Sequence, residues 1–236
     1  DLDIIAPART WGMTREDAIL YAYRHDIPIT ATKEKVYSID DNLWGRAIEC
    51  GEMEDPWAVP PKGVWSLTKQ TATEPRDLVV GFERGTPVSI DGERKSMFEL
   101  VTEMNAIVGS YGWGRIDMVE NRRVGIKSRE TYECPGSLAL IMAHADLESI
   151  TLERDLAREK QRLEPRYAEL VYDGLWFSPL KQALDAFLDE SSQRVSGEVR
   201  VRLHAGSIVV AGSRVAASRY AFRPATYDAP AAYVRR

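Results

Sequence analysis

Apolar and polar residues alternate along three stretches of the chain, with the period of a half-buried strand. The closing segment 198–215 (EVRVRLHAGSIVVAGSRV) alternates most clearly, and it predicts a hairpin that turns at Ala205-Gly206. Residues 78–92 predict a second hairpin around Arg84-Gly85-Thr86, and apolar residues alternate with charged ones over 114–133 as they do in strands.

Helical spacing of apolar residues marks other regions. It predicts a helix over 96–108 and two or three helices over 136–193, broken at Pro165 and Pro179. The string SIDDNLWGRAIECG, which begins at Ser38, combines a Ser-x-x-Asp capping box, apolar residues at helical spacing and a glycine stop. It therefore predicts a further short helix.

The start of the chain has the pattern of one strand followed by one helix. The strand is predicted over 1–7 (DLDIIAP), and Thr14 caps an amphipathic helix that runs to Tyr23. One strand and one helix bury too little surface to fold alone. We therefore interpret residues 1–29 as the last βα unit of an α/β domain, and the chain, which begins at Asp1, as a fragment.

The segment 53–76 is rich in Pro and Trp and has no period, which predicts a long irregular connection held by packing of Trp57 and Trp65. No internal repeat is present. Strands and helices are grouped rather than strictly alternating, which favours an α+β fold with an antiparallel sheet for most of the chain.

Composition excludes several classes of protein. The 236 residues are 44% hydrophobic and 28% charged, enough for a globular core of one large domain or one domain plus part of another. The net charge of −5 argues against a nucleic-acid partner held by phosphate neutralisation. The longest apolar run, 138–145, falls far short of the roughly 20 residues that span a bilayer.

Cysteine and histidine usage indicates neither a disulfide scaffold nor a metal site, and it favours a reducing cytoplasm. Cys50 and Cys134 form no CxxC pair, and the three histidines are scattered (His25, His144 and His204). GxSxG, HExxH and P-loop motifs are absent from the sequence.

Three places carry more polar side chains than structure alone requires. Ser38, with Asp40, Asp41 and Asn42, either caps a helix or lets a helix N-terminus hold an anionic or carbonyl group of a ligand. His144 and Asp146 on a helix are a weaker candidate, because a lone His beside apolar residues is more often a packed residue than a base.

The third place is a run of charged and polar residues over 117–133. Such a run either pairs within a solvated sheet face or lines a pocket for a zwitterion. In the second reading, a carboxylate such as Glu120 meets an ammonium and a phenol such as Tyr132 contacts a polar head group. Spacing alone leaves both readings open.

Two long strings, YSIDDNLWGRAIECGEMEDP (37–56) and GRIDMVENRRVGIKSRETYECPG (114–136), closely resemble the argininosuccinate synthase family. The resemblance extends through ALIMAHADLESITLERD, AELVYDGLWFSPL and IIAPARTWGMTREDAILYAYRHDIPI, and so covers almost the whole chain. It implies an ATP-dependent carbon–nitrogen ligase of arginine biosynthesis. Citrulline and aspartate are condensed through a citrullyl-adenylate, giving argininosuccinate, AMP and pyrophosphate.

The resemblance also implies the roles of particular residues. The serine of the SIDxN string, the glutamate of the VEN string and the tyrosine after the KSR string bind citrulline in the family; these are Ser38, Glu120 and Tyr132 here. Many members have a second citrulline-binding serine where this chain has Ala47, so one contact is lost or replaced. The chain's last residues, 231–236, also depart from the family's tail.

The resemblance implies that residues 1–29 end a nucleotide-binding domain and that 30–236 form the synthetase and oligomerisation domain. ATP, with Mg, is expected to bind mainly to a preceding domain, so the isolated chain is expected to be inactive. A cytoplasmic homotetramer is implied, and Leu138, Ile141 and Met142 are candidates for its contacts. The alternative is a non-catalytic structural or oligomerisation module derived from the family.

Overall fold

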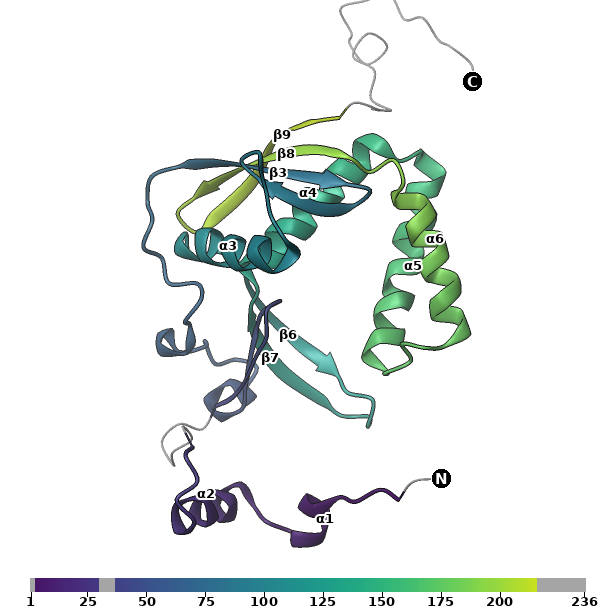
Figure 1. The fold of residues 1–236 in the computed structure, drawn as a ribbon. Helices are drawn as coiled ribbons and strands as arrows, with labels where there is room; N and C mark the ends of the chain where they lie inside the picture. The colour runs from purple at the N-terminus through teal and green to yellow at the C-terminus, as the bar shows by residue number, and fades with distance from the viewer. Residues whose placement is uncertain (1–2, 30–36, 216–236) are drawn as a thin grey trace, which may run out of the picture.

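The computed structural model describes residues 3–29 and 37–215 and shows an α+β protein with two antiparallel sheets (Figure 1). In the first described segment, α1 (Pro7–Trp11) and α2 (Arg15–Arg24) are helices, and residues 3–6 are not a strand, so the predicted strand is wrong. A single strand there would have no partner to satisfy its backbone groups. The predicted helix after Thr14 is confirmed, with a complete capping box to Asp17.

The larger sheet has five strands in the order β5-β4-β3-β8-β9. Its strands are β3 (Arg76–Glu83), β4 (Thr86–Ile90), β5 (Glu93–Arg94), β8 (Gly197–His204) and β9 (Ser207–Arg214). Both predicted hairpins are confirmed, β3–β4 and β8–β9, and the long strands β3 and β8 pair in the middle.

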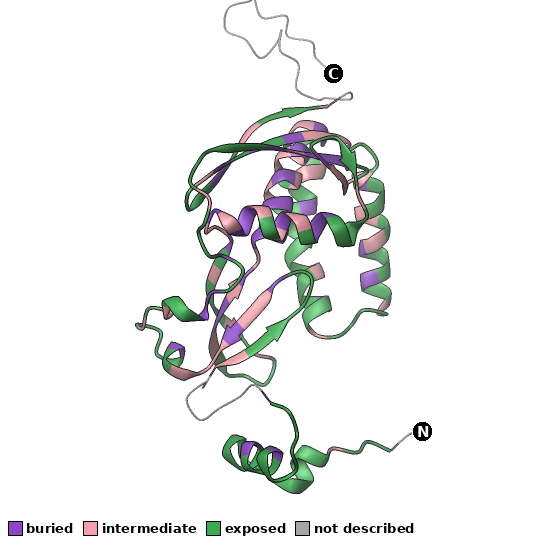
Figure 2. Ribbon diagram, turned by 60° about the vertical axis from the view of Figure 1, so that its left-hand side comes forward, coloured by how far each residue is buried: buried purple, intermediate pink, exposed green. Residues whose placement is uncertain are grey.

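The main core lies between this sheet and two helices, α3 (Met97–Ser110) and α4 (Pro135–Thr151). Alternate residues of the central strands point inward, as Leu78 and Val80 do in β3, and they are fully buried together with Leu100 and Met104 of α3. Figure 2 shows buried residues concentrated where the helices meet the sheet. Burial of this face fixes which side of each strand faces the helices.

The smaller sheet has four strands in the order β1-β2-β7-β6 and extends away from α3 and the larger sheet (Figure 1). Its strands are β1 (Ser38–Asp41), β2 (Arg46–Glu49), β6 (Arg115–Asn121) and β7 (Lys127–Glu133). The strands predicted within 114–133 are confirmed as the β6–β7 hairpin. A second core of Ile48, Met53, Val64 and Trp65 covers one face of this sheet.

The helix predicted from Ser38 is wrong, because this segment forms the β1–β2 hairpin. The side-chain oxygen of Asn42 accepts hydrogen bonds from the amides of Trp44 and Gly45, at 2.8 and 3.2 Å, and so closes the turn. A Cβ on Gly45 would lie 3.1 Å from the Glu133 carbonyl oxygen, so glycine allows the turn to approach β7. Pairing with β7 and burial of Ile48 outweigh the local helical pattern.

Three helices occupy 136–193 as predicted: α4, α5 (Arg154–Tyr172) and α6 (Pro179–Ser192). Pro179 begins α6 after the cap Ser178, but the break predicted at Pro165 is wrong, because Pro165 lies inside α5. The helix is held on both sides of the proline. Lys160 pairs with Glu148 of α4 at 3.1 Å, and the Tyr167 hydroxyl donates to Asp185 of α6 at 3.0 Å.

The connection before β3 is irregular as predicted, apart from the short 3-10 helices η1 (Gly51–Glu54) and η2 (Lys62–Val64). Trp65 packs in the second core at 9% exposure, but Trp57 is 93% exposed, so its predicted packing role is wrong.

Among the described residues, no helix is both long enough and apolar enough to cross a membrane.

Candidate functional site

Strand register brings the three predicted citrulline-binding residues to one face of the smaller sheet. Paired residues on neighbouring strands share a face, and so do residues two apart on one strand. Ser38 pairs with Glu49 across β1–β2, and Glu49 pairs with Glu130 across β2–β7. Tyr132 lies two residues beyond Glu130 and therefore on the same face.

Glu120 joins this face from the other edge. It pairs with Ser128 of β7, which lies two residues before Glu130. We call the face that carries Ser38, Asp40, Ala47, Glu49, Glu120, Ser128, Glu130 and Tyr132 the acidic face. The register thus gathers Ser38, Glu120 and Tyr132, although Ser38 and Tyr132 are far apart in the sequence.

Ser38 is half-buried at the beginning of β1 and caps no helix. Both readings at Ser38, a helix cap and a helix N-terminus that holds an anionic or carbonyl group of a ligand, are therefore wrong. A strand has no comparable alignment of peptide dipoles, so the electrostatics of this place come from its side chains.

Arg122, just after β6, joins three carboxylates of the acidic face. Its Nη2 lies 2.7 Å from Glu49 Oε2 and 2.9 Å from Glu130 Oε1, and its Nε lies 3.4 Å from Glu120 Oε2. Nε also donates to the Ser128 hydroxyl at 2.7 Å. Three carboxyl groups, and Asp40 on the same face, share one guanidinium, so the acidic face carries a surplus of negative charge and attracts cationic groups.

Glu130 is the most buried of these carboxylates, at 8% exposure. Burial, followed by the neighbouring Glu120, raises the pKa of Glu130 above its usual value. The Tyr132 hydroxyl donates to Glu130 Oε2. Burial and this hydrogen bond raise the pKa of Tyr132, so the phenol keeps its proton.

Glu120 behaves in the opposite way. Hydrogen bonds with Glu130 and with the Tyr172 hydroxyl at the end of α5 hold the pKa of Glu120 below its usual value. The next residue of this helix end, Asp173, forms an ion pair with Arg123. The end of α5 thus lies beside the far end of the β6–β7 hairpin (Figure 1). The lowered pKa favours the ionised form of Glu120.

The opposite face of the same sheet carries a different carboxylate. Glu133 is fully buried and accepts hydrogen bonds from three consecutive amides, Ser66, Leu67 and Thr68, at 2.8–3.0 Å. Thr68 Oγ1 and Arg46 Nη1 donate to it as well, at 2.7 and 2.9 Å. Its acceptor capacity is used within the protein, so Glu133 is structural.

His144, the weaker candidate from the sequence, contributes nothing to this site. His144 lies in α4 with its Nε2 3.8 Å from Glu148 Oε1 and its ring 5.9 Å from the ring of Phe82. Burial lowers the pKa of His144, which agrees with the reading of a packed histidine. Within 3–29 and 37–215, no cluster of three His, Cys, Asp or Glu side chains has a geometry for a metal ion.

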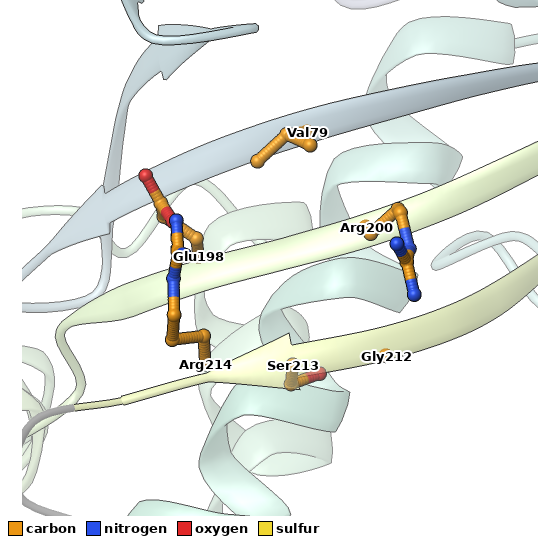
Figure 3. Close-up of a pocket in the computed structure, with 6 residues that line it drawn as sticks. All are labelled: Val79, Glu198, Arg200, Gly212, Ser213 and Arg214. Atoms are coloured by element: carbon orange, nitrogen blue, oxygen red, sulfur yellow. Dashed lines mark hydrogen bonds and ion pairs between the residues drawn. The ribbon is translucent and has the colours of Figure 1, made fainter.

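A shallow hollow of about 440 Å³ lies on the larger sheet, lined by Val79, Glu198, Arg200, Gly212, Ser213 and Arg214 (Figure 3). Arg214 Nε donates to Glu198 at 2.9 Å across β8–β9. None of the predicted site residues lines this hollow, so it is separate from the acidic face.

Sequence reasoning missed Glu49 entirely and treated Arg122 and Glu130 as members of a charged run. The period-two spacing of Ser128, Glu130 and Tyr132 is a signal that could have grouped them on one face. No local signal places Glu49 beside Glu130, because their pairing depends on the β2–β7 register.

Comparison with known proteins identifies the family. Residues 37–236 match the model described as "Arginosuccinate synthase C-terminal domain". The chain belongs to the argininosuccinate synthase family. Argininosuccinate synthases of Rubrobacter xylanophilus and Trichodesmium erythraeum are 51% and 52% identical to it over 231 residues, which is 97% of this chain. The aligned region is 56% and 58% of those proteins, so the chain spans little more than half the length of these synthases.

Proposed function

We propose that the acidic face binds citrulline in an ATP-dependent argininosuccinate synthase, which condenses citrulline with aspartate to give argininosuccinate, AMP and pyrophosphate. The observation that carries this proposal is the register. It places Ser38, Glu120 and Tyr132, the residues implied by the family resemblance, on one face with a surplus of negative charge.

The chemistry of this face suits the amino-acid end of citrulline. The carboxylate of Glu120 accepts from the α-ammonium, and a hydrogen bond of this charge-assisted kind contributes about 1.5–3 kcal/mol. The hydroxyls of Ser38 and Tyr132 add directional contacts. Ala47 lies opposite Tyr132 in the register, so its methyl group leaves room for a water or a neighbouring group where many members have a serine.

In the proposed reaction, the ureido oxygen of citrulline attacks the α-phosphate of ATP and releases pyrophosphate. The amine of aspartate then displaces AMP. The contribution of this chain is to position citrulline and hold its charged end, which reduces the entropy lost on reaching the transition state.

We propose that residues 1–29 end a nucleotide-binding domain, that 30–236 form the synthetase and oligomerisation domain, and that ATP with Mg binds mainly outside this sequence. The free thiols of Cys50 and Cys134 agree with a cytoplasmic location. A homotetramer is proposed, with Ile141, which is 53% exposed on α4, among its contacts; the atypical residues 231–236 lie outside the described part.

The test is pyrophosphate release from ATP by the complete natural polypeptide that carries this sequence, with and without citrulline, alongside its intact mass. Release that depends on citrulline supports the proposal, and release indifferent to citrulline contradicts it. The isolated 236-residue chain is expected to release none.

The second candidate, a non-catalytic assembly module, is favoured by one observation, the alanine at position 47. Isothermal titration of the complete polypeptide with citrulline distinguishes the two. The assembly module predicts no heat of binding, whereas the synthase predicts saturable binding that Glu120→Ala weakens about tenfold or more.

A further inference from the structure

Glu130 has no assigned part in citrulline binding, yet it lies at the centre of the acidic face. One carboxylate oxygen, Oε1, accepts from Arg122 Nη2 at 2.9 Å, and the other, Oε2, accepts from the Tyr132 hydroxyl. At 8% exposure the residue is largely closed off from solvent. The two carboxylate oxygens of Glu130 therefore have different donors, Arg122 for Oε1 and Tyr132 for Oε2.

The number of protons at each group decides what Tyr132 can offer to a ligand. A phenol has one proton to donate and lone pairs with which to accept. The proton of Tyr132 is directed at Glu130, and the side chain is half-buried, with its pKa raised so that the proton stays. The oxygen therefore turns only lone pairs toward a bound molecule.

We infer that Glu130 is a specificity-determining positioning residue. By accepting the hydrogen bond that the Tyr132 hydroxyl donates, it makes the phenol oxygen an obligatory acceptor for the substrate's ammonium. This inference rests on the proposed function, and deepens it by naming the group that the face selects.

A phenol that only accepts hydrogen bonds, lying beside carboxylates, matches an ammonium group of a ligand. An ammonium has three N–H donors and no acceptor, and the acidic face presents oxygens of Glu120, Glu49 and Tyr132. A ureido acid without the amino group leaves these acceptors unpaired, and a site built to pair a substrate N–H rejects the analogue that lacks it.

The variant Glu130→Gln reverses this arrangement because Arg122 can only donate. The new amide must turn its oxygen toward Arg122 Nη2, where Glu130 Oε1 now accepts. Its NH2 group then faces Tyr132 and donates to the phenol oxygen, so the Tyr132 proton must point toward the ligand. The phenol becomes a donor and no longer pairs with an ammonium.

The experiment uses the complete polypeptide and follows citrulline-dependent pyrophosphate release, with the des-amino analogue 5-ureidopentanoate as competitive inhibitor. In Glu130→Gln the Michaelis constant for citrulline is expected to rise about tenfold. The inhibition constant of the analogue and kcat are expected to stay within about twofold. A general loosening of the fold would instead weaken citrulline and analogue alike, and that outcome overturns the inference.

A matched control is Glu159→Gln on the exposed surface of α5, which should leave both constants unchanged. The double variant with Tyr132→Phe provides an independent readout. Without the hydroxyl, Glu130→Gln should add nothing to the Michaelis constant for citrulline, so the two substitutions should be strongly non-additive. Additive effects overturn the inference.

Failure of this inference is distinguishable from failure of the proposed function. If pyrophosphate release by the wild-type polypeptide does not depend on citrulline, the proposed function is refuted, and this inference is refuted with it. Citrulline-dependent release with unchanged discrimination in Glu130→Gln refutes this inference alone.

Discussion

Glu130 and Glu133 lie three residues apart on β7, on opposite faces of the same sheet, and their pKa values shift in opposite directions. Both are buried, and burial raises the pKa of a carboxyl group. For Glu133, hydrogen bonds from Ser66, Thr68 and Arg46 outweigh burial and lower the pKa. Glu130 has fewer donors and a carboxylate neighbour, Glu120, so burial prevails.

The difference shows that the number of hydrogen-bond donors to a carboxylate, rather than its burial, separates structural Glu133 from Glu130 in the candidate binding site. Apart from Arg46, the donors of Glu133 come from the connection 66–68, and these hydrogen bonds hold the connection against the end of β7. Glu130 faces the side where carboxylates outnumber cations, and a ligand ammonium would supply the missing positive charge.

The largest effect is expected from Glu133→Ala. It removes the shared acceptor of three consecutive amides, Ser66, Leu67 and Thr68, and takes from Arg46 its fully buried partner. We expect the free energy of unfolding to fall by about 3–5 kcal/mol, the usual cost of stranding a buried charge, as measured by urea denaturation. A loss below about 1 kcal/mol would show that Glu133 is not structural, and Glu159→Ala on α5 is the control.

The next effect concerns Glu120→Ala on the acidic face. We expect the Michaelis constant for citrulline to rise about tenfold or more in the complete polypeptide, because a charge-assisted hydrogen bond to the ammonium is lost. The urea midpoint should change little, in contrast with Glu133→Ala. An unchanged Michaelis constant would remove Glu120 from the site.

A smaller effect is expected in the pH dependence of stability. The raised pKa of Glu130 means that the folded protein binds its proton more tightly than the unfolded chain does. Its contribution to stability is therefore present at acid pH and lost as pH rises from the ordinary glutamate value of 4.5 through the raised pKa. Glutamine does not ionise, so the free energy of unfolding of Glu130→Gln should increase relative to that of the wild type as pH rises through this interval.

Glu133 has the opposite sign. Its lowered pKa contributes stability above the ordinary value of 4.5 that is lost as pH falls through the lowered pKa. The stability deficit of Glu133→Gln should therefore narrow as the solution is acidified. Urea denaturation at several pH values measures both trends, and parallel curves for the two variants would refute the comparison.

The smallest effect is expected from Ala47→Ser, which adds a hydroxyl to the acidic face opposite Tyr132. We expect the Michaelis constant for citrulline to fall about two- to fivefold, the gain from one neutral hydrogen bond. Ala58→Ser, in the connection outside the acidic face, serves as the control. An increase in the Michaelis constant would mean that another group already fills this place.

Local patterns predicted the elements whose stabilising contacts are close in sequence. The helix α3 begins where the Ser96–Glu99 capping box places it, with Ser96 N donating to Glu99 at 2.9 Å. The hairpin β8–β9 follows from the alternation along β8 and the turn at Gly206. In both cases the information lies within a few residues, so the sequence is sufficient.

Ser38 and Pro165 show where local patterns fail. The capping pattern after Ser38 is real, but pairing of β2 with β7, some 80 residues away, stabilises a hairpin there. Pro165 would end an isolated helix, yet contacts of α5 with α4 and α6 stabilise the helix on both sides of the proline. Neither competing contact can be read from neighbouring residues.

The candidate site divides in the same way. The sequence determined the family, and the family's motifs predict Ser38, Glu120 and Tyr132 as the citrulline-binding residues. Tertiary structure decided that Glu49, Arg122 and Glu130 join them, and that the proton of Tyr132 is directed at Glu130. The physical reason is that strand register sets which charges meet, and register is fixed by packing of the whole sheet rather than by any one strand.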